Sequence, residues 1–183
     1  MSSLFPSLPE VPNLSDVFAA HPQTIGPLTA LLDTIMRDPS PLSVSERELI
    51  AAYVSGLNAC RYCHGSHTGF AEALGVEPGL IDALLQDPET AQVDARLKPL
   101  LAYAKVLTET PSRLTGDHAE AVRAAGWDEA ALFSLVSVCA VFNMMNRIVE
   151  GTGCGVKAGD MARWQSTQIG RYSDWAKSAG LVD

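Results

Sequence analysis

The sequence predicts an all-α protein with a single domain. Apolar residues recur at helical spacing through most of the chain, and prolines and glycines separate these periodic stretches. No segment alternates between apolar and polar residues convincingly enough to indicate a strand. The chain has 183 residues, of which 47% are hydrophobic and 19% are charged, which is enough for one core and typical of one domain.

The first segment, residues 1–22, is predicted to be an irregular arm on the surface or on a neighbouring subunit. Prolines at positions 6, 9, 12 and 22 interrupt any regular structure there. The helical domain is expected to span residues 23–183. Its predicted helices lie near residues 24–37, 43–56, 60–74, 77–86, 93–109, 115–125, 128–149 and 158–178.

The most apolar of these stretches, AALFSLVSVCAVFNMM at residues 130–145, is too short to span a membrane. It has 16 residues, whereas a span needs about 20. It also contains Asn143 and is followed by Asn146 and Arg147. We therefore expect the central helix of a packed bundle or an oligomer interface.

Composition also restricts the class of protein. With 13 basic and 21 acidic residues the net charge is -8, which disfavours nucleic acid and anionic membranes as partners. The start, MSSLFPSLPEVPNL, has no basic region, and prolines break its apolar stretch, so we expect no signal peptide and a cytoplasmic location. In that reducing compartment, a closely spaced cysteine pair is more often catalytic or metal-binding than structural.

The stretch NACRYCHGSH, residues 58–67, contains such a pair. On a helix, Cys60, Cys63 and His67 fall on one buried-facing side, with His64 on its shoulder. Asn58 is predicted to cap the helix, so both thiols would lie in or beside its first turns, where the helix dipole lowers a thiol pKa. The two sulfurs can close into a disulfide, and His67 is placed to exchange a proton.

Other interpretations use the same residues. Cys-x-x-Cys-His is also the attachment motif of c-type haem, with His64 as the axial ligand, but that requires export. Zinc could bind Cys60, Cys63 and His67, although Cys139 and Cys154 offer no second cluster in the sequence. An inert buried pair is the third alternative. We favour the redox pair.

A redox pair needs a proton acceptor, and Glu46 and Glu48 are the candidates on the preceding helix. Ser45 and Glu48 could form a capping box, which would give Glu48 a purely structural role. Alternatively, Glu48 shares its face with a strip of small residues and could reach the cysteines. Periodicity alone does not separate Glu46 from Glu48.

These residues resemble the alkylhydroperoxidase AhpD core within the carboxymuconolactone decarboxylase family, and more narrowly its peroxidase-related branch. The resemblance covers about residues 20–175. It rests on the spacing of Glu48, Cys60, Cys63 and His67, on Tyr62 within the motif, and on the later Phe142-Asn143-x-x-Asn146-Arg147. It favours Glu48 over Glu46.

The resemblance implies an AhpD-like helical bundle that forms a homo-oligomer and reduces hydroperoxides. Cys63 would attack the peroxide, Cys60 would condense with the resulting sulfenic acid, and His67 with Glu48 would relay protons. No metal or organic cofactor is implied, and an unidentified dithiol would reduce the disulfide. Tyr62 departs from AhpD, which has histidine at that position, so the relay could be rewired. The helix dipole instead favours Cys60 as the attacking thiol.

Two other classes of function remain open at this stage. One is a decarboxylase or lactone-processing enzyme, which the broader family name implies but which needs no dithiol. The other is a zinc-binding or redox-responsive module without enzymatic activity.

Overall fold

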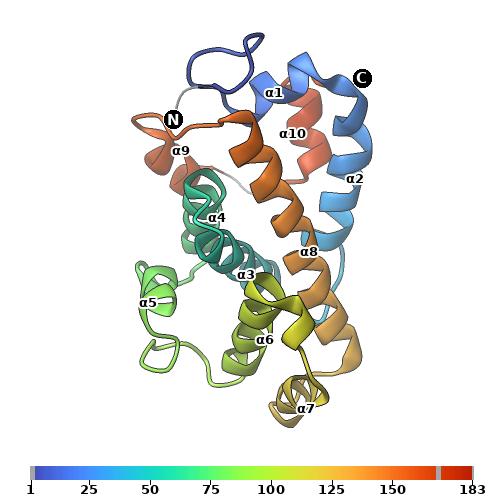
Figure 1. Ribbon diagram of the computed structural model, residues 1–183, viewed down its shortest axis with the longest axis vertical. Helices are drawn as coiled ribbons and strands as arrows, with labels where there is room; N and C mark the ends of the chain where they lie inside the picture. The colour runs from blue at the N-terminus through green and yellow to red at the C-terminus, as the bar shows by residue number, and fades with distance from the viewer. Residues whose placement is uncertain (1–2, 168–169, 183) are drawn as a thin grey trace.

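The structure is a computed structural model that describes residues 3–167 and 170–182 (Figure 1). The described residues are helical and contain no strand. The helices are α1 (Leu14–Ala20), η1 (Pro22–Thr24), α2 (Ile25–Met36), α3 (Val44–Leu57), α4 (Arg61–Ala73), α5 (Leu80–Gln86), α6 (Leu97–Glu109), η2 (Pro111–Arg113), α7 (Gly116–Ala124), α8 (Glu129–Thr152), α9 (Asp160–Ser166) and α10 (Tyr172–Ser178). The predicted all-α class is confirmed.

Two of the predicted segments differ from the structure. The arm is not wholly irregular, because Asn13 and Asp16 form a capping box that starts α1 directly after Pro12. The single helix expected at 158–178 is two helices, α9 and α10. Asp33 of α2 caps the second one, accepting hydrogen bonds from the backbone of Tyr172 at 2.6 Å and of Ser173 at 3.2 Å.

The core is built around α3, which packs against α4, α8 and α6 (Figure 1). The 24-residue α8 is long and apolar enough for a membrane span by composition. However, Leu135, Phe142 and Val149, spaced seven residues apart, are buried in the bundle. Helix α8 is therefore the central helix of a packed bundle, which is one of the two roles that the sequence predicted for it.

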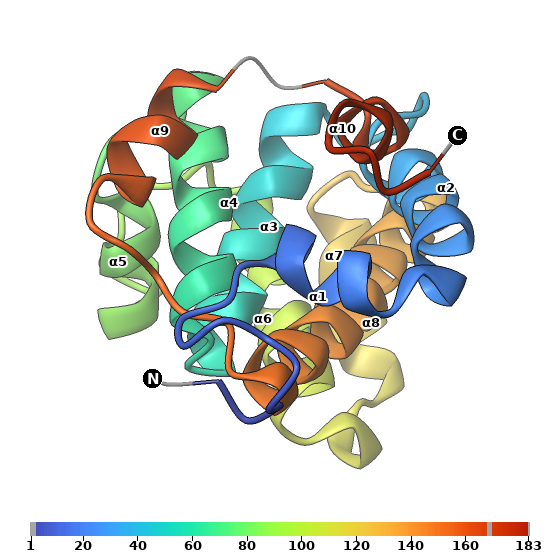
Figure 2. The same ribbon diagram turned by 90° about the horizontal axis from the view of Figure 1, so that it is seen from above.

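Seen from above, α3 and α4 run side by side, α9 covers α4, and α10 lies against α2 (Figure 2). Glycines allow α9 to approach α4 closely. A Cβ atom on Gly69 would lie 2.9 Å from Cβ of Trp164 and 3.1 Å from the backbone nitrogen of Gln165. This close packing brings Trp164 against Tyr62, which lies between the two cysteines of the motif.

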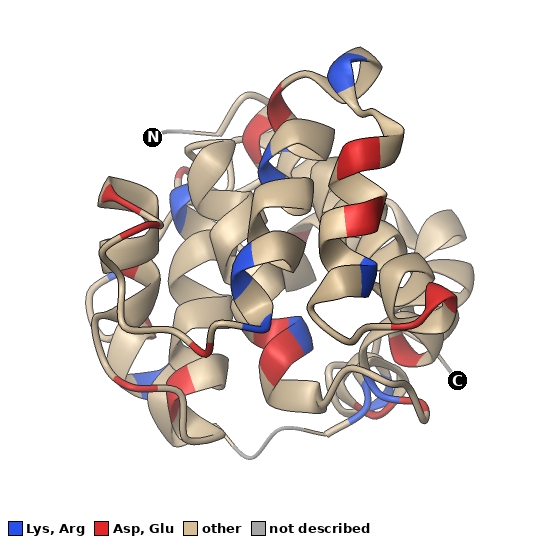
Figure 3. Ribbon diagram, turned by 90° about the horizontal axis from the view of Figure 1, so that it is seen from below, with Lys and Arg blue, Asp and Glu red and all other residues tan. Residues whose placement is uncertain are grey.

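Charged residues do not form a single basic surface on the lower face. There, Lys and Arg are interspersed with Asp and Glu along the helices (Figure 3). The only charged groups buried below 4% exposure among the described residues are Asp33, Arg47 and Glu48. Of these three, Glu48 lies beside the cysteine motif.

Candidate functional site

The start of α3 leaves Glu48 free for a role in the site. Its capping box is formed by Ser43 and Glu46, not by Ser45 and Glu48. Glu46 is thus the structural residue, and the capping role considered for Glu48 is wrong. Glu48 lies on the next turn of α3. Its side chain points into the bundle and has no exposed surface.

The Glu48 carboxylate bridges two basic side chains. Its Oε1 lies 2.7 Å from Nη2 of Arg37, and its Oε2 lies 2.5 Å from Nδ1 of His67. Burial by itself raises the pKa of Glu48, but His67 and Arg37 outweigh it and hold that pKa below its ordinary value. Glu48 is therefore an ionised carboxylate at neutral pH. It fixes the His67 ring through Nδ1 and leaves Nε2 as the other ring nitrogen.

A tight turn connects α3 to the cysteine helix. Asn58 ends α3, and Ala59 adopts a left-handed conformation with φ of 55°. Cys60, rather than Asn58, is the N-cap residue of α4, which corrects the sequence-based expectation. The Asn58 side chain instead donates to Oδ1 of Asn143 at 3.2 Å and of Asn146 at 2.9 Å.

The two thiols lie together at the start of α4, as predicted. Cys60 is fully buried and Cys63 is 3% exposed, and both belong to one buried cluster. The neighbouring Cys60 thiol and burial raise the pKa of Cys63 well above its ordinary value, although Asn146 opposes the shift. The expected lowering of this pKa by the helix start is therefore outweighed.

A third thiol belongs to the same buried cluster. Cys154, just after α8, packs with Cys60, Cys63 and Val149, and Val17 of α1 covers them. No sequence pattern indicated this proximity. Cys139 lies in the main core instead, and burial raises its pKa to about 12.

Two neighbouring cavities reach this cluster from the outside. The outer pocket holds about 290 Å³ and the inner one about 60 Å³. Six residues line both cavities, and they are Leu14, Tyr62, Ser66, His67, Tyr172 and Trp175. Cys63 lines the inner cavity, whereas Cys60 lines neither. A small molecule in the inner cavity would thus meet Cys63 and His67 together.

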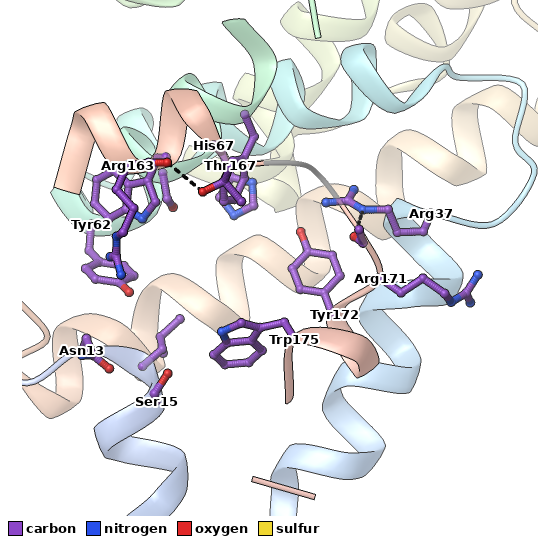
Figure 4. Close-up of a pocket in the computed structure, with 15 residues that line it drawn as sticks. Asn13, Ser15, Arg37, Tyr62, His67, Arg163, Thr167, Arg171, Tyr172 and Trp175 are labelled. Atoms are coloured by element: carbon purple, nitrogen blue, oxygen red, sulfur yellow. Dashed lines mark hydrogen bonds between the residues drawn. The ribbon is translucent and has the colours of Figure 1, made fainter. Parts of the chain in front are cut away.

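Arg37 and Tyr172 are site residues that the sequence analysis missed. The Arg37 guanidinium lies 4.7 Å from the centre of the Tyr172 ring. The Tyr172 hydroxyl is buried, makes no hydrogen bond within the described part of the chain, and points toward the space between His67 and Arg37 (Figure 4). Burial, followed by the Glu48 charge, raises the pKa of Tyr172, so this hydroxyl is a proton donor.

His64, the axial ligand considered for haem, lies outside the site. His64 contacts the carbonyl oxygen of Ala52 at 3.0 Å and Asp82 at 3.2 Å, on the other side of α4. Within residues 3–167 and 170–182, no three His, Cys, Asp or Glu side chains are grouped to hold a metal ion. Tyr62 packs edge-on against Trp164, and burial raises its pKa to about 12.

The fold and the site together define an all-helical protein with a buried dithiol beside the chain of His67, Glu48 and Arg37. Residues 22–106 match the carboxymuconolactone decarboxylase family profile. The chain is thus similar to the AhpD-like, carboxymuconolactone decarboxylase family, which confirms the resemblance seen in the sequence.

Solved structures agree with this similarity. An uncharacterized peroxidase-related protein from Silicibacter sp. TM1040 has a TM-score of 0.75 and 28% identity, over 85% of this chain and 80% of that one. An uncharacterized peroxidase-related protein from Ralstonia eutropha JMP134 with the AhpD core has a TM-score of 0.76 and 20% identity, over 84% and 80%. The second likeness shows the fold alone. No curated protein matches the chain.

Proposed function

We propose that this protein is a cysteine-based hydroperoxide reductase that cycles between a Cys60–Cys63 dithiol and a disulfide. The observation that carries the proposal is the position of Cys63. It packs in one buried cluster with Cys60 and lines the same small cavity as His67. Nucleophile and proton carrier thus share one cavity that can hold a peroxide group, and the resolving thiol lies next to the nucleophile in the buried cluster.

The location of Cys63 favours it over Cys60 as the attacking thiol. Because its pKa is raised, Cys63 needs a base, and Nε2 of His67 is the ring nitrogen that Glu48 leaves available. His67 takes the Cys63 proton, the sulfur attacks the distal peroxide oxygen, and the O–O bond breaks. The protonated His67 returns its proton to the leaving alkoxide, which gives an alcohol and Cys63 sulfenic acid.

Cys60 then completes the cycle. Its thiol attacks the sulfenic sulfur, so a disulfide and one water form before further oxidation can occur. An external dithiol, whose identity we leave open, reduces the disulfide in turn. In this scheme Arg37 positions Glu48, and the Tyr172 hydroxyl donates a hydrogen bond to a peroxide oxygen.

Counting free thiols tests the proposal. One equivalent of cumene hydroperoxide should remove two of the four thiols of the wild-type protein. Cys63→Ser should abolish this loss, whereas Cys139→Ser, which changes a buried thiol in the main core, should still lose two. If wild-type protein loses none, a decarboxylase or lactone-processing activity, or a non-enzymatic module, replaces the peroxidase.

We also propose a homo-oligomer in the cytoplasm. Phe133 and Met144 of α8 are 71% and 39% exposed and lie 11 residues apart, on nearly the same face of the helix. Leu31 of the neighbouring α2 is 46% exposed. Such apolar groups are typical of subunit contacts. Light scattering should give a multiple of the 19.5 kDa chain mass, and Phe133→Asp should reduce it.

A further inference from the structure

The outer pocket has a chemical character that the peroxidase reaction alone does not require. Its walls are largely apolar and aromatic, from Leu14, Phe70, Trp164 and Trp175. Its volume of about 290 Å³ corresponds to about ten molecules of the size of water, far more than a peroxide group needs. The pocket can therefore enclose the apolar body of an organic molecule whose peroxide end reaches the inner cavity.

The charges of this pocket are of one sign. Arginines are present among the described residues that line it, at positions 37, 163 and 171, and no Asp or Glu is. Arg37 is committed to Glu48, and Arg171 points away from the pocket, where Asp33 and Asp38 hold it (Figure 4). In contrast to these two arginines, Arg163 has its side chain beside Tyr62 at the pocket (Figure 4).

Arg163 is placed to bind an anion. Its side chain is 60% exposed, and one of its nitrogens, Nη2, lies 2.9 Å from Asp160 on the same helix. The Asp160 side chain is 13% exposed, but this contact uses one nitrogen of a guanidinium that has five N–H donors, so the exposed remainder can still pair with a ligand. Tyr62 lines both cavities, so the Arg163 end of the pocket connects along one wall to the cavity of Cys63.

From this arrangement, and resting on the proposed function, we infer that the substrate is an amphipathic hydroperoxide that carries a carboxylate. The peroxide group enters the inner cavity, the apolar body lies between the aromatic walls, and Arg163 pairs with the carboxylate. The reaction is that given above, with the hydroperoxide reduced to the alcohol and the dithiol oxidised, so the carboxylate is unchanged.

The kinetic test compares a medium-chain fatty-acid hydroperoxide with its methyl ester, which differs only in charge. Wild-type protein should show a kcat/KM for the acid about two- to five-fold above that for the ester, the range expected of an exposed ion pair. Arg163→Gln should abolish this ratio. The control is Arg123→Gln on α7, since Arg123 is 53% exposed and pairs with Glu120 at the same spacing, away from the pocket, and should retain the ratio.

A binding measurement separates this inference from the peroxidase proposal. Decanoate has no peroxide group, and its binding can be followed by the fluorescence of Trp164 and Trp175, which line the pocket. Wild-type protein should bind decanoate more tightly than Arg163→Gln does. Decanol should bind both proteins with the same affinity. Arg163-dependent decanoate binding without any hydroperoxide reduction overturns the reductase, and with it the hydroperoxide substrate, and leaves Arg163 as a carboxylate-binding residue only. Equal rates for acid and ester, with decanoate binding indifferent to Arg163, overturn the inference and leave the reductase standing.

Discussion

Replacing Glu48 by Gln gives the sharpest test of how the site is held together. The change keeps the size of the side chain but removes a fully buried negative charge that contacts Arg37 and His67. The Arg37 side chain is only 9% exposed, so its charge would lose its partner inside the protein. Removing one partner of a buried ion pair costs about 3–5 kcal/mol.

For a chain of this length, that cost corresponds to a fall in Tm of roughly 6 to 20 °C. Equilibrium unfolding in urea measures the same loss as a free energy. The matched control is Glu46→Gln, two residues earlier on the same helix. Glutamine also completes a capping box, so this variant should lose less than about 1 kcal/mol.

The pH dependence adds a second signature. Because the folded-state pKa of Glu48 is depressed, its contribution is present above the ordinary Glu pKa of about 4.3 and is lost as pH falls through the folded value. The stability gap between wild type and Glu48→Gln should therefore shrink below about pH 4. If Glu48→Gln is as stable as Glu46→Gln at pH 7, the buried charge network does not have the role assigned to it.

Two further substitutions test the walls of the site. Tyr172→Phe removes a buried hydroxyl without a protein partner, so the free energy of unfolding should stay unchanged or rise by up to about 1 kcal/mol. Hydroperoxide turnover should nevertheless fall, and unchanged turnover would remove Tyr172 from the mechanism. Gly69→Ala places a Cβ 2.9 Å from Trp164 and should cost about 1–3 kcal/mol in urea unfolding while it weakens decanoate binding. The control Gly151→Ala, with nothing within 4 Å, should not destabilise the protein.

The parts of the fold that depend on local pattern were predictable. Apolar periodicity and proline or glycine punctuation located α2 to α8, because each of these helices buries one face of its own sequence. The break between α9 and α10 depends on Asp33, about 140 residues away, which caps the second helix. Such a cap leaves no trace in the local sequence around residues 158–178.

The candidate site divides in the same way. Cys60, Cys63 and His67 lie within about two helical turns, so helical spacing alone brings them together. The α3–α4 hairpin brings Glu48 to them. In the sequence, only the motif resemblance favoured Glu48 over Glu46. The structure explains this choice, because Glu46 is used in the capping box with Ser43. Arg37 and Tyr172 come from the end of α2 and the start of α10, where no pattern marks them.

The raised pKa of Cys63 gives this arrangement its chemical logic under the proposed function. An exposed thiolate reacts with any oxidant, whereas a buried neutral thiol reacts only where a base accepts its proton. Here that base is His67. Glu48 orients the His67 ring through a hydrogen bond, and Arg37 forms an ion pair with the Glu48 carboxylate. Reactivity is thus confined to a molecule that enters the cavity shared by Cys63 and His67. Replacing Arg37 should therefore lower hydroperoxide turnover, although Arg37 does not contact the Cys63 sulfur.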